Sequence, residues 1–469
     1  MAEGTPYNRR TLIKGIAVGT GLAAKSSSQI LQTRSGKNRP NILYLHSHDT
    51  GRYTEAYGHD VPTPNLQKLA REGILFRQAF SAAPTCSPSR AALLTGQCAH
   101  SSGMLGLAHR GFSLKDYRQH LVHTLRDAGY VSVLAGLQHV AKTPDAIGYD
   151  RILEAKTKTA AHVAPAAVSF LKDAPRQPFF LDVGFFETHR IFHEPGPQED
   201  ARYSRPPVTV PDAPRSRQDM AGFKASARVL DRAVGAVLTA LETAGLAENT
   251  LVICTTDHGV PFPGAKCNLT QHGTGVMLTM RGPGVFTGGK TCDALVSQID
   301  LFPTICDLLE VRPPDWLQGH SILPLLRGER PEINDHVFAE VTYHAAYEPK
   351  RSIRTHRFNY IRNFGSRRTP VLPNCDDSPS KSLWLEAGWR QRPVPVEELY
   401  DVVFDPNETH NLADDPDHAS VRNEMRSLLE QWMTKTGDPL LKGGVPAPRG
   451  AEVNDPDGTS PQEPTTKVS

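Results

Sequence analysis

The segment from Cys86 to Arg90 carries the most specific chemical signal in the sequence, and it reads Cys-Ser-Pro-Ser-Arg. Pro88 suits the first turn of a helix, and Gly96 suits the end of a short one. Cys86 would then lie at a helix N-terminus, where backbone N–H groups favour an anion. Arg90 lies about one turn further on and could bind the same anion. A lone buried cysteine is usually inert packing, but this spacing of proline and arginine favours a functional cysteine.

Residue types that bind metals and transfer protons collect after four predicted strands. In chain order they are His46, His48 and Asp49, then His139, then Glu187, His189 and Arg190, and finally Asp257 and His258. In open α/β sheets, ligand sites form beyond the carboxyl ends of the strands. One polar loop would be uninformative, but four such loops predict a single shared pocket.

A divalent cation suits this set of side chains, because carboxylates and imidazoles are among its usual donors. We predict that Asp49, Asp257 and His258 bind one such ion together with the Cys86 side chain. His48 is a further candidate ligand, although its tautomer and direction do not follow from the sequence. The alternative is that these carboxylates cap helices or face solvent. We favour that alternative for any single residue taken alone, but we favour the metal site for the residues taken together.

Short apolar runs predict the strands that carry these loops, at residues 41–45, 131–134, 179–183 and 251–254. Helices are predicted between them, at residues 64–73, about 113–128 and about 221–244. The last of these is amphipathic, with apolar residues at helical spacing. Alternating strands and helices indicate an α/β fold, in which a large, mainly parallel sheet lies between helices.

The pattern changes near Asn334, where extended segments at 337–341 and 360–361 indicate antiparallel pairing. A last helix is predicted from about 419 to 434. The final residues are rich in Gly, Pro, Asp and Thr, a composition typical of disorder. We therefore expect a catalytic domain at 39–333, a smaller C-terminal α+β domain at 334–436, and a disordered tail at 437–469.

Residues 1–38 have the features of a twin-arginine signal followed by a linker. Arg9-Arg10 precedes a short apolar run from Gly15 to Ala24, which is too short to span a bilayer. We therefore expect an extracytoplasmic location in a bacterium, periplasmic or secreted; the alternative is a mobile basic tail. No later stretch approaches about 18 uninterrupted apolar residues, so we expect no membrane anchor.

Composition narrows the function classes further. The formal net charge is +2 over 469 residues, which argues against a nucleic-acid binder but leaves room for a local anion site. The seven cysteines include no Cys-x-x-Cys pair, which argues against a zinc ribbon or a thioredoxin-like site.

At Cys86 to Gly96 the sequence resembles the type I sulfatases of the alkaline-phosphatase-like superfamily, whose signature is Cys-x-Pro-x-Arg followed by a small-residue, leucine-rich helix. The resemblance covers most of the chain from Arg39 to about Leu412, including Thr255–Gly259 and Glu398–Leu412. Within that family, the chain is most similar to the heparan N-sulfatases (sulfamidases). The segments that carry this similarity are Phe185–Arg190 and Gly259–Leu269.

The resemblance implies an alkaline-phosphatase-like fold and a sulfated saccharide substrate. It implies that a formylglycine-generating enzyme converts Cys86 to formylglycine, whose hydrate attacks sulfur with one hydroxyl and releases sulfate with the second. The metal would be calcium, as is usual for the family. The resemblance implies that Arg90 and Lys266 stabilise charge on the sulfuryl oxygens. His139 and His189 would transfer protons, with His189 preferred as the acid. Glu187 and Arg190 would bind the substrate.

Two positions depart from the family pattern. The family usually has a paired Asp-Asp where this chain has His48-Asp49, and the added nitrogen donor could shift the metal preference from calcium towards manganese, with magnesium also possible. Sulfatases also commonly have Gly-Lys-x-His where this chain has Gly136-Leu137-Gln138-His139. Lys142 could replace the missing cation.

Three readings of the function stay open. The first is a sulfatase that acts on N-sulfoglucosamine of heparan-type glycans. The second is an O-sulfatase, or a phosphonate or phosphodiester hydrolase, because these reactions need nearly the same metal and nucleophile. The third is a non-catalytic glycan-binding relative. Fold analogy alone cannot separate them, and the sequence leaves the oligomeric state open.

Overall fold

Strand β1 (Asn41–Ser47) lies inside an eight-stranded sheet that organises the computed structural model, which describes residues 39–469. The strand order is β5-β4-β6-β1-β7-β8-β2-β9, and β8 alone of these runs antiparallel to its neighbours. The other bounds are β2 Ile74–Phe76, β4 Val131–Gly136, β5 Arg151–Leu153, β6 Phe179–Gly184, β7 Thr250–Thr256, β8 Leu278–Arg281 and β9 Lys290–Cys292. The predicted leader at 1–38 lies outside the described residues.

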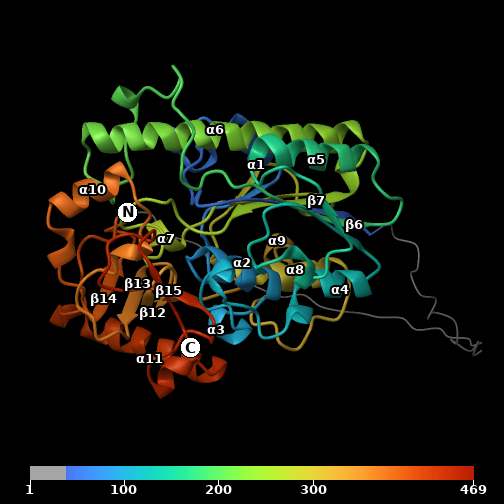
Figure 1. Cartoon of the computed structure of the whole chain (residues 1–469). Helices are drawn as coiled ribbons and strands as arrows, with labels where there is room; N and C mark the ends of the chain where they lie inside the picture. Colours follow the sequence, from blue (N-terminus) through green and yellow to red (C-terminus); the bar gives the residue numbers. More distant parts are fainter. Residues whose placement is uncertain (1–38) are drawn as a thin grey trace, which may run out of the picture. The chain divides into compact units, whose positions relative to one another are not determined.

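Helices cover both faces of this sheet (Figure 1). Side chains alternate along a strand, so Leu43 and Leu45 of β1 enter one core while Ile42 and Tyr44 enter the other. The first core contains α1 (Pro64–Glu72), α5 (Ala160–Lys172) and α6 (Pro214–Thr243); the second contains α2 (Cys86–Thr95), α4 (Leu121–Asp127) and α8 (Leu301–Leu308). The predicted α/β sheet between helices is therefore confirmed.

Two helices differ from their predicted lengths. The helix expected at about 113–128 is α4 alone, because the His120 side chain accepts a hydrogen bond from the Val122 N–H and begins the helix there. Conversely, α6 begins at Pro214, ahead of the predicted start near 221, since proline suits the first helical turn. Within residues 39–469, none of the helices is both long enough and apolar enough to cross a membrane.

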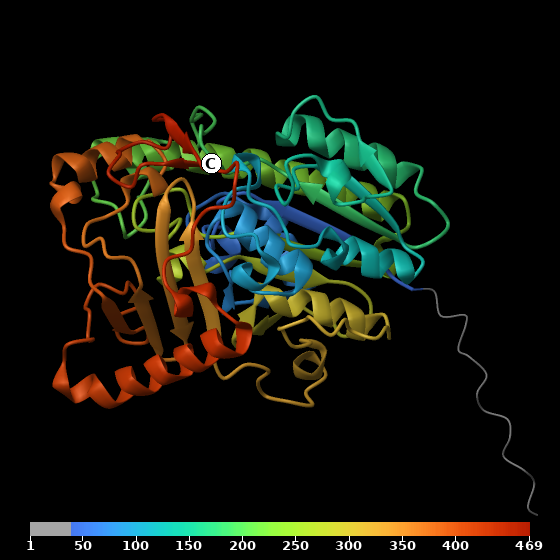
Figure 2. The same ribbon diagram turned by 60° about the horizontal axis from the view of Figure 1, so that its bottom comes forward.

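A second, antiparallel sheet follows in the order β11-β12-β13-β14. Its strands are β11 (Val337–Tyr343), β12 (Tyr347–Arg354), β13 (Phe358–Asn363) and β14 (Glu397–Asp401). Helix α11 (Ala419–Thr436), the long red helix of Figure 2, packs against it through Met425, Leu429 and Met433. This part is the smaller α+β region that the sequence predicted, and it belongs to the same compact unit as the large sheet, residues 39–469.

The segment 437–469 differs from its predicted disorder. It contains a short 3-10 helix (Pro439–Lys442) and an antiparallel pair, β15 (Glu452–Asn454) with β16 (Thr465–Lys467). Ala451 is fully buried. The composition was misleading because the glycines and prolines serve tight turns, while the few remaining side chains pack on surfaces that the rest of the chain provides.

A buried ionic network links the short helix α3 (Ala99–Ser102) and the antiparallel sheet to this segment. Arg351 donates through Nε to Asp438 at 2.6 Å and lies 3.2 Å from a Glu340 oxygen, while His100 Nδ1 lies 3.0 Å from the other oxygen. Burial lowers the pKa of His100, but Glu340 outweighs it and raises the pKa to about 10. Burial raises the pKa of Glu340, but His100 and Arg351 lower it to about 2.

We predict that Glu340→Gln lowers the free energy of unfolding by about 3–5 kcal/mol near neutral pH, because it leaves buried cations unpaired. The folded-state pKa of His100 lies above its ordinary value of 6.5, so its stabilisation is complete below about pH 6.5 and is lost as the pH rises through about 10. The melting temperature, measured by thermal unfolding from pH 6 to 10, should therefore fall less with rising pH in Glu340→Gln than in the wild-type protein. The exposed Glu424→Gln on α11 is the control, and equal declines in all three proteins would contradict the prediction.

Candidate functional site

Cys86 is the first residue of α2 and is 2% exposed. The side chain of the preceding residue, Thr85, makes no capping hydrogen bond, so the first backbone N–H groups of the helix are available beside Cys86. Burial raises the pKa of the Cys86 thiol well above its ordinary value, and the nearby Lys266 only partly opposes this. An unmodified thiol held neutral in this way is a poor nucleophile.

The ends of β1 and β7 bring the first and fourth polar loops together. The two strands are parallel neighbours, with Ser47 paired to Thr256, so Asp49 and Asp257 lie just beyond the same edge. The Asp49 N–H donates to Asp257 Oδ1 at 2.8 Å. Asp49 has a φ of +56°, a left-handed conformation that is uncommon for a residue other than glycine. This turn directs its side chain at the loop that follows β7.

His258 completes a set of donors that fits a divalent cation. Its Nδ1 lies 3.0 Å from the Gly259 carbonyl, a contact in which Nδ1 carries the hydrogen and donates it. Nε2 then carries the lone pair, 3.2 Å from Asp49 Oδ1 and 3.7 Å from Asp257 Oδ2, and it has no hydrogen-bond partner among residues 39–469. A bare nitrogen facing two carboxylate oxygens inside a protein calls for a cation between them.

The charges around these donors agree with this interpretation. Burial would raise the pKa of Asp49, but Lys266 and nearby histidines hold it well below its ordinary value. The pKa of Asp257 is lowered in the same way by His258 and Arg90. Burial lowers the pKa of His48 to about 4, so at neutral pH its imidazole is neutral, as a metal ligand must be. Ligand atoms of His48, Asp49, Cys86 and Asp257 all lie within 4.8 Å of one another.

Arg90 reaches back from α2 towards the same carboxylate. Its Nη2 donates to Asp257 Oδ2 at 3.0 Å and to the Ser47 carbonyl at 2.9 Å, while Nη1 contacts His46 Nδ1. Within the part of the chain that the structure describes, the Nε–H of this buried guanidinium has no partner. Arg90 therefore orients a candidate metal ligand and also leaves one N–H unused beside the site.

Lys266 lies between two carboxylates and a histidine. Its Nζ is 2.9 Å from Asp49 Oδ2, 2.9 Å from Asp376 Oδ2 and 3.4 Å from His189 Nε2. Lys142, suggested from the sequence as the missing cation, is exposed on the loop after His139. Lys266 is thus the lysine that reaches the site.

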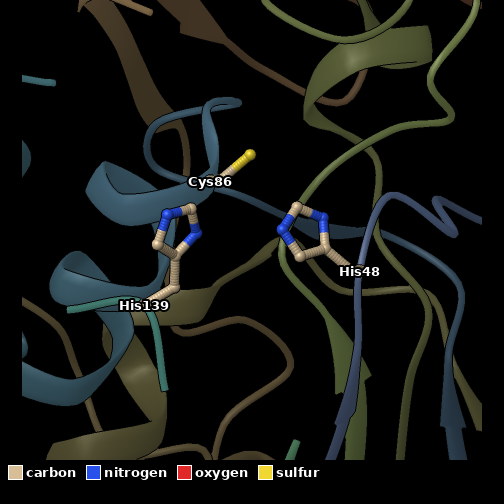
Figure 3. A group of neighbouring side chains, drawn as sticks. All are labelled: His48, Cys86 and His139. Atoms are coloured by element: carbon tan, nitrogen blue, oxygen red, sulfur yellow. The ribbon is translucent and has the colours of Figure 1, made fainter. Parts of the chain in front are cut away.

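His48 and His139 face each other next to Cys86 (Figure 3). Their ring centroids are 5.9 Å apart, and burial lowers the pKa of His139 well below its ordinary value. His139 Nε2 lies 2.9 Å from Nδ1 of His109, an exposed residue that the sequence did not single out. His139 Nδ1 is buried and has no hydrogen-bond partner in the described residues, which leaves it available to a bound group.

Two further residues of the site were missed at the sequence level. Asp376 contacts Lys266 from the loop after a 3-10 turn, Leu372–Asn374. His344, in the turn between β11 and β12, places Nε2 4.0 Å from Cys86 Sγ. Both belong to the smaller sheet region, and neither follows a strand of the large sheet. The only signal was a polar loop, which the sequence has in many places.

Glu187 and Arg190, the predicted substrate-binding residues, both have protein partners. Arg190 donates to both carboxylate oxygens of Asp219 on α6, at 2.6 and 2.9 Å, and stacks on Phe192 and Phe262. Glu187 accepts a hydrogen bond from the Ala160 N–H at the start of α5, at 2.8 Å. Their role in substrate binding stays a prediction.

Comparisons with known proteins agree with this geometry. Residues 40–311 match the family model described as Sulfatase, and residues 266–380 match N-sulphoglucosamine sulphohydrolase, C-terminal. The chain is 30% identical to N-sulphoglucosamine sulphohydrolase of Homo sapiens, over 86% of this chain and 91% of that protein. It is also 30% identical to an ulvan-active sulfatase of Formosa agariphila, over 91% and 87%.

A solved structure extends the likeness to the fold. It is a protein in complex with its substrate, D-glucosamine-2-N,6-O-disulfate. The TM-score is 0.70 at 18% identity, over 89% of this chain and 99% of that one. At this level of identity the comparison concerns the fold alone, and it agrees with the two sheets described above.

Proposed function

The chain belongs to the sulfatase family, and on that premise we propose that it removes the sulfuryl group from N-sulfoglucosamine at the end of a heparan-type chain. One observation carries the proposal. The segment matching the N-sulphoglucosamine sulphohydrolase model, residues 266–380, contributes Lys266, His344 and Asp376 to the site. The similarity therefore covers the residues beside Cys86 and not merely the scaffold.

Formylglycine at position 86 is the nucleophile in this proposal, made by a formylglycine-generating enzyme during maturation. Its hydrated aldehyde supplies the attacking hydroxyl. Two observations support the modification: the Cys-Ser-Pro-Ser-Arg spacing and the raised pKa of the unmodified Cys86 thiol. The free N–H groups at the start of α2 and the unused Nε–H of Arg90 are the proposed donors to the anionic sulfuryl group.

A divalent metal completes the site, held by Asp49, Asp257, His258 and His48. Such an ion lowers the pKa of a nucleophile and offsets the charge of the sulfuryl group. Calcium is the family's usual metal, but the orphaned Nε2 of His258 and the neutral imidazole of His48 add nitrogen donors. Nitrogen donors favour transition metals over calcium, so we propose manganese ahead of calcium or magnesium.

His189 is the proposed acid for the leaving amine. Its Nε2 lies 3.4 Å from Lys266 Nζ, its Nδ1 lies 2.6 Å from the Arg190 carbonyl, and its side chain is 24% exposed. The ring is thus oriented by its own loop while part of it stays exposed. His139, on the other side of Cys86, is the proposed group that accepts the proton of the second hydroxyl.

We predict that His189→Ala loses about 100-fold or more in kcat on N-sulfoglucosamine, because the departing amine must gain a proton. The loss in kcat on an aryl sulfate should be smaller, because a phenolate can leave without gaining a proton. Steady-state kinetics on both substrates measure the difference, with His162→Ala on α5 as the control. Equal losses on the two substrates would count against His189 as the acid.

An O-sulfatase is the second candidate function. The observation that favours it is the equal identity, 30%, to an ulvan-active sulfatase. Nothing in the carboxylate and histidine set distinguishes N–S from O–S cleavage. Efficient turnover of a 6-O-sulfated but not an N-sulfated glucosamine would establish this candidate in place of the first.

The leader is proposed to direct export of already folded protein through the twin-arginine route. Arg9-Arg10 followed by the short apolar run supports this. We predict that replacing both arginines with lysine retains the protein in the cytoplasm, as measured by fractionation and immunoblotting. Normal export of the double variant would rule out the signal.

A further inference from the structure

The C-terminal segment 451–463 is hydrogen-bonded to a turn beside Cys86. The Asn454 N–H donates to the Ala345 carbonyl at 2.8 Å, and Arg110 donates to Asn454 Oδ1 at 2.5 Å. Arg110 also donates to the Pro461 carbonyl at 3.1 Å and to the Ala345 carbonyl at 3.3 Å. One guanidinium therefore joins this segment, which we call the strap, to the 344–346 turn.

The far side of the strap is tied to the loop that carries Asp376. Ser460 Oγ donates to Asp377, and Arg367 pairs with Asp457. Asn374 Oδ1 in turn accepts hydrogen bonds from the N–H groups of Ala345 and Ala346, at 2.9 and 2.8 Å. The strap, the 344–346 turn and the 374–377 loop thus form one polar network.

Three anchors of the strap, Arg110, Ala345 and Asp377, each lie one residue from a group of the site. Arg110 follows His109, which contacts His139 at 2.9 Å. Ala345 follows His344, whose Nε2 lies 4.0 Å from Cys86 Sγ, and Asp377 follows Asp376, 2.9 Å from Lys266. The strap therefore holds both flanks of the site, from the His109 side to the Asp376 side.

The strap also lies beside exposed residues at the edge of the site. Cys86 and Asp49 are buried, whereas the side chains of His189 and Asp376 are 24% and 14% exposed and His109 is exposed. Of these exposed groups, His109 and Asp376 adjoin the anchors Arg110 and Asp377. A segment fixed next to both residues is placed to close one side of a pocket between them.

We infer that Asn454 and Arg110 are positioning residues, and that the strap forms one wall of the substrate pocket, which limits the enzyme to saccharides that enter by a chain end. The inference rests on the proposed function for its substrate. Small displacements of groups that position a substrate have large effects on rate, about 100-fold for 1 Å. Loss of the wall would in addition admit an internal residue of a longer chain.

Asn454→Ala tests the inference, with Thr465→Ala on the exposed strand β16 as the matched control. We expect kcat/KM on a disaccharide with terminal N-sulfoglucosamine to fall about 10-fold or more in Asn454→Ala, chiefly through KM, and to be unchanged in the control. Sulfate release from an internal N-sulfoglucosamine of an octasaccharide should become measurable in Asn454→Ala. Unchanged kinetics on both substrates would overturn the inference.

Hydrogen exchange separates a failure of the strap from a failure of the proposed substrate. The N–H at position 454 donates to the Ala345 carbonyl, and Arg110 supports this contact through Asn454 Oδ1. The protection factor of this N–H should be at least about 10-fold lower in Asn454→Ala than in wild type or Thr465→Ala, with or without any activity. Equal exchange would overturn the positioning role even if N-sulfoglucosamine is the substrate. If another sulfated substrate is the one turned over, the same kinetic comparison is made with that substrate.

Discussion

The Cys86→Ala variant is expected to fold normally and to lose about 10⁴-fold or more in kcat on any sulfated substrate, a loss typical of removing a nucleophile. The methyl group fits where the thiol was, at the buried start of α2, and the ligands Asp49 and Asp257 keep their contacts with Lys266 and Arg90. The unmodified cysteine cannot substitute for formylglycine, because burial raises the pKa of the Cys86 thiol well above its ordinary value.

Peptide mass spectrometry of active protein measures the modification directly. The peptide containing position 86 should carry the aldehyde or its hydrate, and the specific activity of different preparations should rise in proportion to that fraction. Cys306→Ala on α8 is the control, since it removes another buried thiol outside the site. Full activity from Cys86→Ala, or from protein that is purely in the thiol form, would refute the mechanism.

The Asp257→Asn variant is expected to lose bound metal, with an affinity loss of at least about 100-fold, since groups that only support ligands already cost 10–100-fold. The side-chain volume is kept, but one of the two carboxylates facing His258 Nε2 is neutralised. Arg90 also loses its anionic partner. Elemental analysis should find about one equivalent of divalent metal in wild type, with manganese exceeding calcium, and little in the variant.

Asp231→Asn is the matched control for the metal experiment. Asp231 is a buried carboxylate on α6 that accepts hydrogen bonds from the N–H groups of Asn65 and Leu66, so its loss affects packing of α1 and not the site. The Asp231→Asn variant should keep its bound metal and most of its activity. Unchanged metal content and rate in Asp257→Asn would refute the assignment of that carboxylate as a ligand.

The convergence of the strand-end loops could be predicted because it follows from sheet geometry alone. Once 41–45 and 251–254 are recognised as buried parallel strands, Asp49 and Asp257 must lie beyond one edge, and the structure places them within hydrogen-bonding distance. The motif at Cys86 likewise specified a helix start, since a proline in the first turn and a glycine after the last are local signals. The strands and the helix start could each be recognised from neighbouring residues, and the rules of sheet geometry supplied the long-range step.

The residues contributed by the smaller sheet could not be predicted in this way. His344 and Asp376 reach the site across sequence separations of 258 and 110 residues, from loops with no periodic pattern. Arg190 pairs with Asp219, and Glu187 accepts a hydrogen bond from the Ala160 N–H. These contacts could not be predicted, because only the packing of α6 and α5 brings the partners close. The folded tail was missed for the same reason, because its partners lie elsewhere in the chain.

Sulfate release from a panel of substrates tests the central claim most directly. The panel contains N-sulfoglucosamine, 6-O-sulfated glucosamine, an aryl sulfate and a phosphodiester, each assayed with enzyme whose formylglycine content has been verified and with Cys86→Ala. We predict that the verified enzyme has its highest kcat/KM on N-sulfoglucosamine. Cys86→Ala should release no measurable sulfate from any compound of the panel. Faster hydrolysis of the phosphodiester than of every sulfated compound, or no sulfate release by verified, metal-loaded enzyme, would contradict the account.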